Sequence, residues 1–211
     1  MKYSSFLDRR QNTFERTYDL VLQNINSNKT YNIVELGTSR SFVSGNHLGC
    51  CSTDTKYWYP NNPLLWDWGA GIFTKVFSDN LQNYNYKLYT VDPDPSANSI
   101  VKTIIGNNPK VDIIQDYSTN FLNNIDFKID LLYMDHMESS ESACLQHLED
   151  SKILIEKNLM APNSIILIDD TPINASAEES KGKYSIPYLL NNHYIKLIHE
   201  YQALLIKNPT V

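Results

Sequence analysis

Two apolar segments of the sequence stop on acidic residues. IDLLYMDH, at 129–136, reaches Asp135, and SIILIDD, at 164–170, ends in Asp169 and Asp170. Neighbouring parallel strands lie roughly 5 Å apart and bring their carboxyl ends to one crevice. We therefore expect the three acids to share one site, although they are distant in the sequence.

Three carboxylates at one place repel each other unless a positive charge lies between them. A divalent ion such as Mg2+ or Mn2+ is the simplest candidate, because it binds oxygen ligands and leaves positions open for a substrate. The pattern therefore predicts Asp135, Asp169 and Asp170 as metal ligands.

A second group of polar residues follows the first strand of the chain. YNIVELG, at 31–37, ends in Glu35 and Gly37, and KLYTVDPDP, at 87–95, carries Asp92 after its apolar part. A first strand that ends in Glu-x-Gly, followed by a strand that ends in an acidic residue, is typical of sites for an adenosine-containing cofactor. Gly37 would let the ligand approach the backbone closely, and Asp92 would accept hydrogen bonds from ribose hydroxyls.

The turn after Gly37 indicates which cofactor is expected. It reads TSRSF and lacks the second and third glycine of the dinucleotide fingerprint G-x-G-x-x-G, which favours S-adenosylmethionine over NAD. Ser39 and Arg40 follow the turn directly and are candidates for the methionine carboxylate, with a solvated Arg40 as the alternative. An ordinary turn at Glu35 and Gly37 is the alternative to a cofactor site.

Alternating strands and helices are needed to position these residues. The expected fold is a single α/β domain over 1–211, with a Rossmann-like, doubly wound, mostly parallel seven-stranded sheet and an antiparallel edge hairpin. The N-terminal region 1–30 is expected to hold an amphipathic helix over 4–27. The other expected elements are strands at 31–37, 87–95, 111–116, 129–136 and 164–170, helices at 70–84 and 140–159, and a short helix with a closing strand pair beyond Pro187.

The segment 44–71 is too long for an ordinary connection between a strand and a helix, and it is expected to be a lid. It contains five aromatic residues: Tyr57, Trp58, Tyr59, Trp66 and Trp68. These side chains either pack the loop onto the body of the protein or form a wall for a flat or sugar-like ligand.

The composition excludes several classes of partner. The net charge is −6, and the basic residues are dispersed, which argues against nucleic-acid binding. No apolar run approaches the roughly 20 residues of a membrane span. The odd number of cysteines and the lack of an apolar signal region predict reduced thiols in the cytoplasm.

From about Tyr31 to the C-terminus, the sequence resembles the class I S-adenosylmethionine-dependent methyltransferases. IVELGTS is similar to the first motif of that family, Asp92 to the acid after its second strand, and QDYS, at 115–118, to its adenine-side segment. The cofactor-binding residues implied by the residues and the resemblance together are Glu35, Gly37, Thr38, Ser39, Asp92, Asp116, Ser118 and Asp135, with Tyr117 as a further adenine-side candidate.

Within that class the sequence is most similar to the metal-dependent O-methyltransferases. The fourth strand of the catechol enzymes ends like YMDH and the fifth ends in Asp-Asp or Asp-Asn, which implies a metal at Asp135, Asp169 and Asp170. The macrolide and aminocoumarin sugar enzymes also have Asp-Asp there and a Glu-Ser segment like Glu138 and Ser139. The implied reaction is methylation of a hydroxyl that the ion makes more acidic.

Two departures from the family leave the general base open. The catechol enzymes have a lysine three residues after the first metal-binding Asp, where this chain has Glu138, and the sugar enzymes have a second Asp where this chain has Met137. The candidates are His136, Glu138 and a metal-bound carboxylate such as Asp135. A sugar acceptor is slightly preferred over a catechol, because the lysine is absent and aromatic side chains can stack on pyranose rings.

Three other functions remain open at this point. The first is a metal-independent methyltransferase in which Asp135 contacts the cofactor's amino group or the acceptor. The second is a Rossmann-type nucleotide-binding protein, such as an oxidoreductase or a nucleotide-sugar enzyme, and the third is a binding module without turnover. The expected partner is a small hydroxylated acceptor, sugar or catechol-like, and a homodimer is left open.

Overall fold

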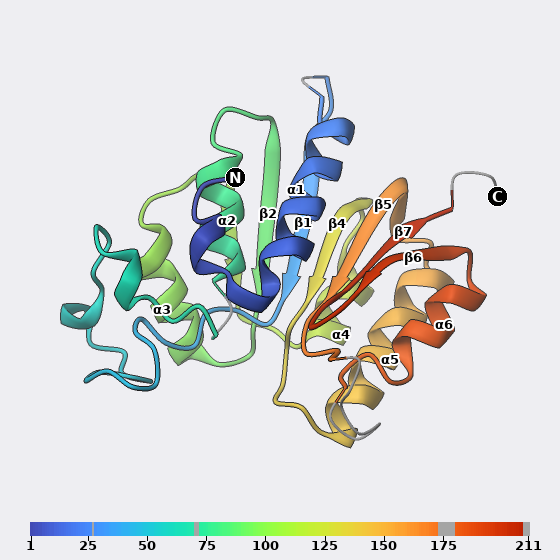
Figure 1. The fold of residues 1–211 in the computed structure, drawn as a ribbon. Coiled ribbons are helices and arrows are strands. Elements are labelled where there is room, and N and C mark those ends of the chain that lie inside the picture. Colours follow the sequence, from blue (N-terminus) through green and yellow to red (C-terminus); the bar gives the residue numbers. More distant parts are fainter. Residues whose placement is uncertain (27, 70–71, 173–179, 209–211) are drawn as a thin grey trace.

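The structure is a computed structural model that describes residues 1–26, 28–69, 72–172 and 180–208. In this part of the chain, seven strands form one sheet in the order β3-β2-β1-β4-β5-β7-β6 (Figure 1). The strands from β1 to β5 pair in parallel, and β7 is antiparallel to both β5 and β6. This confirms the predicted mostly parallel sheet with an antiparallel hairpin at one edge. The strands are β1 (Tyr31–Leu36), β2 (Tyr86–Val91), β3 (Val111–Ile114), β4 (Ile129–Met134), β5 (Met160–Ile168), β6 (Tyr194–His199) and β7 (Ala203–Lys207).

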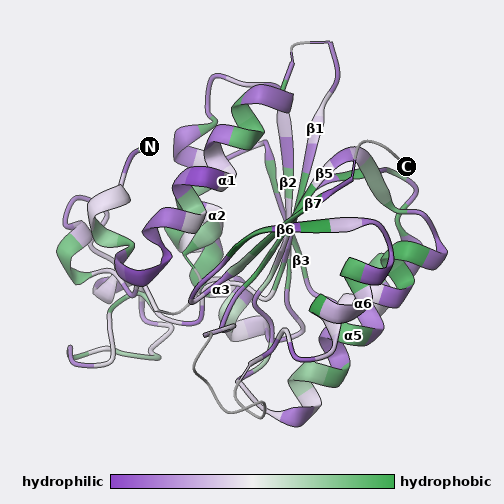
Figure 2. Cartoon of the chain, turned by 45° about the vertical axis from the view of Figure 1, so that its right-hand side comes forward, coloured by the Kyte–Doolittle hydropathy of each residue, from purple (hydrophilic) through white to green (hydrophobic). Residues whose placement is uncertain are grey.

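Helices cover both faces of the sheet. Phe14 of α1 and Phe73 of α2 pack on one face with Ile33 and Leu131, whereas helices α4, α5 and α6 pack on the other. Figure 2 shows hydrophobic residues along the central strands and hydrophilic residues on the outward sides of the helices. The helices are α1 (Gln11–Asn24), α2 (Phe73–Asn80), α3 (Pro95–Ile105), α4 (Ser118–Asn124), α5 (Glu141–Glu156) and α6 (Ser185–Asn191), and the short 3-10 turns are η1 (Ser4–Phe6), η2 (Asp8–Arg10), η3 (Thr55–Tyr57) and η4 (Pro63–Leu65). No helix in the described ranges has the length and hydrophobicity needed to cross a membrane.

The alternation of side chains along β4 separates two groups that are adjacent in the sequence. Tyr133 packs with α1 on one face of the sheet, and Met134 packs in the core of the opposite face. The alternation continues past the end of the strand, because Asp135 contacts Tyr133 whereas His136 stacks on His147 of α5. Asp135 and His136, which are adjacent in the sequence, therefore lie in different environments on the two faces of the sheet.

The N-terminal segment differs from the helix expected over 4–27. The α-helix begins only at Gln11, because the backbone turns sharply before it: Tyr3 and Asp8 have φ angles of 73° and 46°. The first ten residues instead contain the 3-10 turns η1 and η2. The second turn ends at Arg10, which this path brings to the carboxyl-terminal edge of the sheet, beside Asp169.

The long loop is held by its own aromatic residues. The Trp66 side chain is 1% exposed and stacks on Trp58 and Trp68, with ring centroids 5.0 Å and 5.5 Å apart. Tyr3 and Phe6 of the N-terminal segment pack against the same rings. The tryptophans therefore pack the loop against the body of the protein, as the packing alternative predicts. Residues 70–71 of the predicted lid lie outside the described residues.

Candidate cofactor pocket and acidic cluster

The turn after β1 requires a glycine for a reason different from the predicted one. Gly37 has a φ of +87°, and a Cβ atom there would lie 2.7 Å from the backbone N and Cα of His136. The close neighbour of Gly37 is therefore the end of β4. Immediately after it, the Thr38 N–H donates to Asp92 Oδ2 over 3.2 Å, which ties this turn to the end of β2.

A pocket of about 410 Å3 lies at the carboxyl ends of β2, β3 and β4. This volume falls in the range of roughly 300–1,000 Å3 that is usual for small-molecule sites. The pocket brings together the predicted residues Asp92, Ser118 and His136, with Tyr117 and Arg40. Burial raises the pKa of Asp92, although the N–H groups of Asp94 and Thr38 stabilise its charged form. Its lining is Arg40, Val91, Asp92, Pro93, Tyr117, Ser118, Thr119, His136, Met137 and Gln146.

Six of the predicted cofactor residues, Gly37 and Asp135 among them, do not line this pocket. Thr38 and Ser39, which follow Gly37 in the turn, are buried. Asp116 Oδ1 accepts from the Tyr117 N–H and the Asn120 amide and so holds the start of α4. Glu35 is fully buried, accepts a hydrogen bond from Thr74 of α2, and has its pKa raised to about 8 by burial.

A second pocket of about 580 Å3 adjoins the long loop and shares one residue with the first. Asp67 and Cys51 of the loop line it, together with Asp94 at the start of α3. Arg40 belongs to the walls of both pockets, and its guanidinium forms an ion pair with Glu138, whose side chain is 80% exposed. The Arg40–Glu138 pair therefore lies where the two pockets meet.

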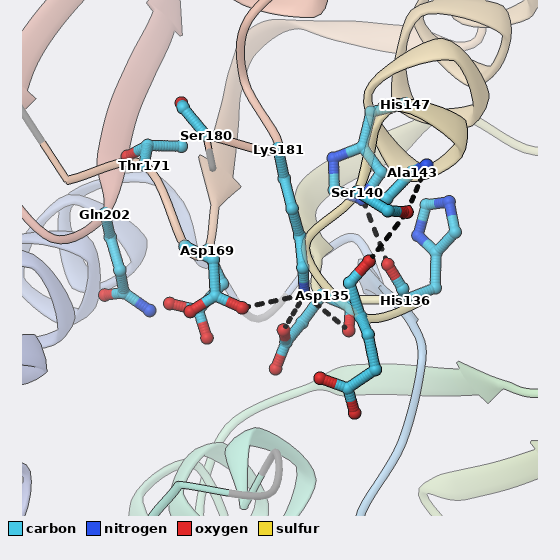
Figure 3. Close-up of polar contacts among 12 residues, drawn as sticks. Asp135, His136, Ser140, Ala143, His147, Asp169, Thr171, Ser180, Lys181 and Gln202 are labelled. Atoms are coloured by element: carbon cyan, nitrogen blue, oxygen red, sulfur yellow. Dashed lines mark hydrogen bonds and ion pairs between the residues drawn. The ribbon is translucent and has the colours of Figure 1, made fainter. Parts of the chain in front are cut away.

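The three acids at the tips of β4 and β5 converge as expected. One carboxylate oxygen from each of Asp135, Asp169 and Asp170 lies within 4.8 Å of the others. Figure 3 shows the Lys181 side chain extending to Asp135, with Asp169 beside it. We call Asp135, Asp169 and Asp170 the acidic cluster.

Each acid of the cluster already has a cationic partner from the protein. Lys181 Nζ lies 3.0 Å from Asp135 Oδ1 and 2.9 Å from Asp170 Oδ2, and the lysine side chain is 1% exposed. Arg10 donates from Nε and Nη2 to the fully buried Asp169, over distances of 2.8 to 3.2 Å. A positive charge among the acids is expected from the sequence, and the chain itself supplies two, from Lys181 and Arg10.

Tyrosine hydroxyls complete the hydrogen bonding of the cluster. Tyr133 donates to Asp169 Oδ2 over 2.9 Å and also reaches Asp135 Oδ2 at 3.2 Å, and Tyr201 donates to Asp170 Oδ1. Every carboxylate oxygen of the cluster therefore lies within hydrogen-bonding distance of Lys181, Arg10 or one of these hydroxyls. A divalent ion would have to approach the oxygens to about 2.0–2.6 Å, which places it against the Lys181 ammonium. The cluster with Lys181 in place does not fit a divalent ion.

Asp135 and Asp170 of the acidic cluster differ in the direction of their pKa shifts. Burial and the neighbouring charge of Asp169 raise the pKa of Asp135 to about 7, despite the opposing effect of Lys181. Burial also opposes the charge of Asp170, but Lys181 and the Tyr201 hydroxyl outweigh it and hold the pKa of Asp170 below its usual value. Asp135 is therefore the acid best suited to exchange a proton near neutral pH.

The three candidates for the general base lie in three different environments. Asp135 belongs to the acidic cluster, and Glu138 is exposed beside Arg40. His136 forms part of the pocket wall, where its Nε2 lies 2.9 Å from Asp150 Oδ2 of α5. The second oxygen of Asp150 accepts from the Ser118 hydroxyl over 3.0 Å and from the Gln146 amide over 3.2 Å, so Asp150 holds three residues of the pocket wall.

Lys181, Arg10 and Asp150 were not predicted from the sequence as residues of the site. Lys181 follows a segment without hydrophobic periodicity, and Arg10 falls within the amphipathic helix expected over 4–27, where a charged residue is ordinarily solvated. Asp150 had a usable signal, because it lies three positions after His147 and four before Leu154 on the buried stripe of α5. An acid on such a stripe needs a buried partner.

Comparison with known proteins shows what the chain is similar to. A family model described as a methyltransferase domain matches residues 68–171. Among solved structures, the N-methyltransferase NodS from Bradyrhizobium japonicum is 12% identical, with a TM-score of 0.54 and coverage of 95% of this chain and 99% of that one. No curated protein sequence gave a match.

Two further solved structures share the fold. A Streptococcus mutans protein assigned to the methyltransferases, in complex with SAH, is 12% identical, with a TM-score of 0.54 and coverage of 92% and 97% of the two chains. A Clostridium thermocellum protein assigned as an rRNA methylase is 13% identical, with a TM-score of 0.51 and coverage of 92% and 96%. Identities this low carry information about the fold alone.

Proposed function

Since the chain has the fold of the class I methyltransferases and matches a methyltransferase-domain model over residues 68–171, we propose that it binds S-adenosylmethionine in the pocket at Asp92 and methylates a hydroxyl group of a small acceptor. The observation that carries this proposal is the position of the 410 Å3 pocket at the strand ends, with an acid after β2 and polar side chains after β3. Ligands of open α/β sheets bind in this crevice. Asp92 would accept from the ribose hydroxyls, and Ser118 and Tyr117 would border the adenine.

The acceptor class follows from charge and from the cluster. A net charge of −6 disfavours an RNA substrate, although one structural neighbour is assigned as an rRNA methylase. A hydroxyl needs a base to become nucleophilic, and a carboxyl group with a pKa near neutral, such as Asp135, supports that role. Because Trp58, Trp66 and Trp68 pack against each other, the aromatic argument for a sugar loses its support. The absence of the catechol-type lysine, replaced here by Glu138, is the argument for a sugar that remains, and both acceptor classes enter the test.

The proposed reaction uses the side chains of the cluster without a divalent ion. S-adenosylmethionine supplies a methyl group on a sulfonium, which needs no activation. Asp135 would accept the acceptor's proton as the acceptor oxygen bonds to the methyl carbon and the bond from carbon to sulfur breaks, leaving S-adenosylhomocysteine. Lys181 would hold the Asp135 carboxylate in position through its 3.0 Å contact.

The cofactor site is tested by calorimetry with S-adenosylhomocysteine. We expect saturable binding by the wild-type protein and a loss of about 10- to 100-fold in affinity for Asp92→Asn, the cost of losing a charged hydrogen-bond acceptor. Asp112→Asn, which removes a carboxylate paired with Lys87 at the base of β3, is the matched control and should bind like wild type. Binding of NAD with no binding of S-adenosylhomocysteine would favour a nucleotide-binding protein instead.

The reaction is tested by methyl transfer to a panel of sugar and catechol acceptors, measured with and without excess EDTA. We expect activity to persist in EDTA, and we expect Asp135→Asn to lower the turnover by about 10²- to 10⁴-fold while S-adenosylhomocysteine affinity stays unchanged. Activity that is lost in EDTA and restored by Mg2+ would support the metal-assisted reaction predicted from the sequence.

A further inference from the structure

The ammonium group of Lys181 is surrounded by oxygen atoms. Its Nζ lies 2.9 Å from Asp170 Oδ2, 3.0 Å from Asp135 Oδ1 and 3.5 Å from the Asp135 carbonyl oxygen. These three contacts equal the number of N–H donors on an ammonium group. The side chain is 1% exposed, so protein atoms take the place of water around the charge (Figure 3).

Arg10 compensates the remaining acid from another part of the chain. Its guanidinium bonds Asp169 through two nitrogens, and its Nη2 lies 3.9 Å from Asp170. The cluster thus contains three carboxylates and two fixed cations, one from the N-terminal segment and one from the connection after β5. A divalent ion added to this set would meet two positive charges at close range.

From this arrangement we infer that Lys181 occupies the position a divalent ion would take between Asp135 and Asp170, so that the acidic cluster is closed by the protein's own cations. Lys181 is then a positioning residue for the two carboxylates. The inference concerns the acids and their cations, and it holds or fails independently of methyl transfer.

We expect that removing the charge of Lys181 creates a metal-binding site. Lys181→Met keeps the buried aliphatic stem and removes the charge, leaving three carboxylates and Arg10 around a space for an ion. The matched control is Lys183→Met, two residues further on, which removes a lysine that pairs with Glu141 outside the cluster. Mn2+ binding is measured by the loss of the free-ion signal in electron paramagnetic resonance, up to roughly 1 mM, the weak end of carboxylate sites.

We expect the wild-type protein and Lys183→Met to show no saturable site that depends on Asp170. Lys181→Met should gain one such site, with affinity at least about tenfold above any wild-type binding, and Asp170→Asn in the same background should remove it. Thermal unfolding with and without Mn2+ provides a second readout, in which the ion should raise the melting temperature of Lys181→Met alone.

Two results would overturn the inference. One is a saturable Mn2+ site in the wild-type protein that Asp170→Asn abolishes, because the ion and Lys181 would then coexist. The other is a folded Lys181→Met variant, judged by circular dichroism, that binds no Mn2+. The wild-type titration decides the question even if Lys181→Met fails to fold.

Discussion

Glu35 illustrates how burial can outweigh hydrogen bonding in setting the state of a carboxyl group. It is fully buried on β1, and burial raises its pKa to about 8, so the native carboxyl is neutral at pH 7. In the unfolded chain the same group ionises near its ordinary value of 4.5. Between these two values the native state binds one proton more than the unfolded state.

The free energy of unfolding should therefore fall as the pH rises from about 4.5 to about 8, by at most about 1.4 kcal/mol per pH unit from this group, and level off above. Glu35→Gln, which has no charge to gain, should remove this contribution and be more stable than wild type at pH 8. Denaturant unfolding at several pH values measures it, with Glu149→Gln on the surface of α5 as the control. Equal slopes for wild type and Glu35→Gln would contradict the prediction.

The acidic residues of the cluster could be predicted from the sequence, whereas their cationic partners could not. Asp135, Asp169 and Asp170 were predictable because an acid that ends an apolar strand lies at the sheet's functional edge. Lys181 and Arg10 were not, because a long flexible side chain can reach the cluster from many positions in the sequence, and no local pattern distinguishes the one that does.

The 3-10 turn η2 connects the N-terminal segment to the end of β5 through one buried ion pair. Arg10 is 9% exposed in its side chain and Asp169 is 0% exposed, so neither charge is well solvated once its partner is lost. Removing one partner of such a pair typically costs about 3–5 kcal/mol, because the other charge stays buried and uncompensated.

Arg10→Met should therefore lower the free energy of unfolding by about 3–5 kcal/mol, as measured by urea denaturation. Arg9→Met is the matched control: Arg9 lies over the Tyr201 ring at 3.5 Å, an exposed contact worth about 0.5–1 kcal/mol. Similar losses for the two variants would show that the pair with Asp169 is not what holds the segment. A double-mutant cycle with Asp169→Asn measures the coupling directly.

The elements themselves were predictable where the hydrophobic period was long and regular. Strands β1 to β4 and helix α5 match their predicted ranges apart from their ends. Strand β5 begins at Met160, four residues before the predicted strand, and helices α3 and α4 were not predicted. The start of α1 was wrong because tertiary contacts decide it: Tyr3 packs on the loop tryptophans and Arg10 bonds Asp169, and both contacts require a path other than a helix. The hydrophobic periodicity of the sequence does not indicate tertiary contacts of this kind.

The whole sheet depends on its last strand pair. β7 lies between β5 and β6, so that the C-terminal strands complete the sheet instead of extending a finished one. Leu204 and Leu205 of β7 are fully buried, one on each face. The sequence predicted the pair, but the insertion of β7 beside β5 is a matter of topology that alternation alone does not fix.

A chain that ends at Asn192 should therefore lose cooperative unfolding, because β5 would expose a backbone edge and both faces would lose apolar cover. A chain that ends at Asn208 keeps the pairing of β6 with β7 and should unfold like the full chain. Thermal unfolding followed by circular dichroism distinguishes these outcomes. A cooperative transition in the shorter chain would mean that the parallel strands form an independent unit.

Arg40 stands in the wall of two pockets at once, one at the strand ends and one beside the long loop. Any molecule that displaces this guanidinium from one side alters the room and the charge available on the other. Thermodynamic linkage makes such an influence reciprocal: if the occupant of one pocket strengthens or weakens binding in the second by some factor, the second does the same to the first. Cooperativity between two ligands can thus be carried by a single side chain, without rearrangement of the sheet.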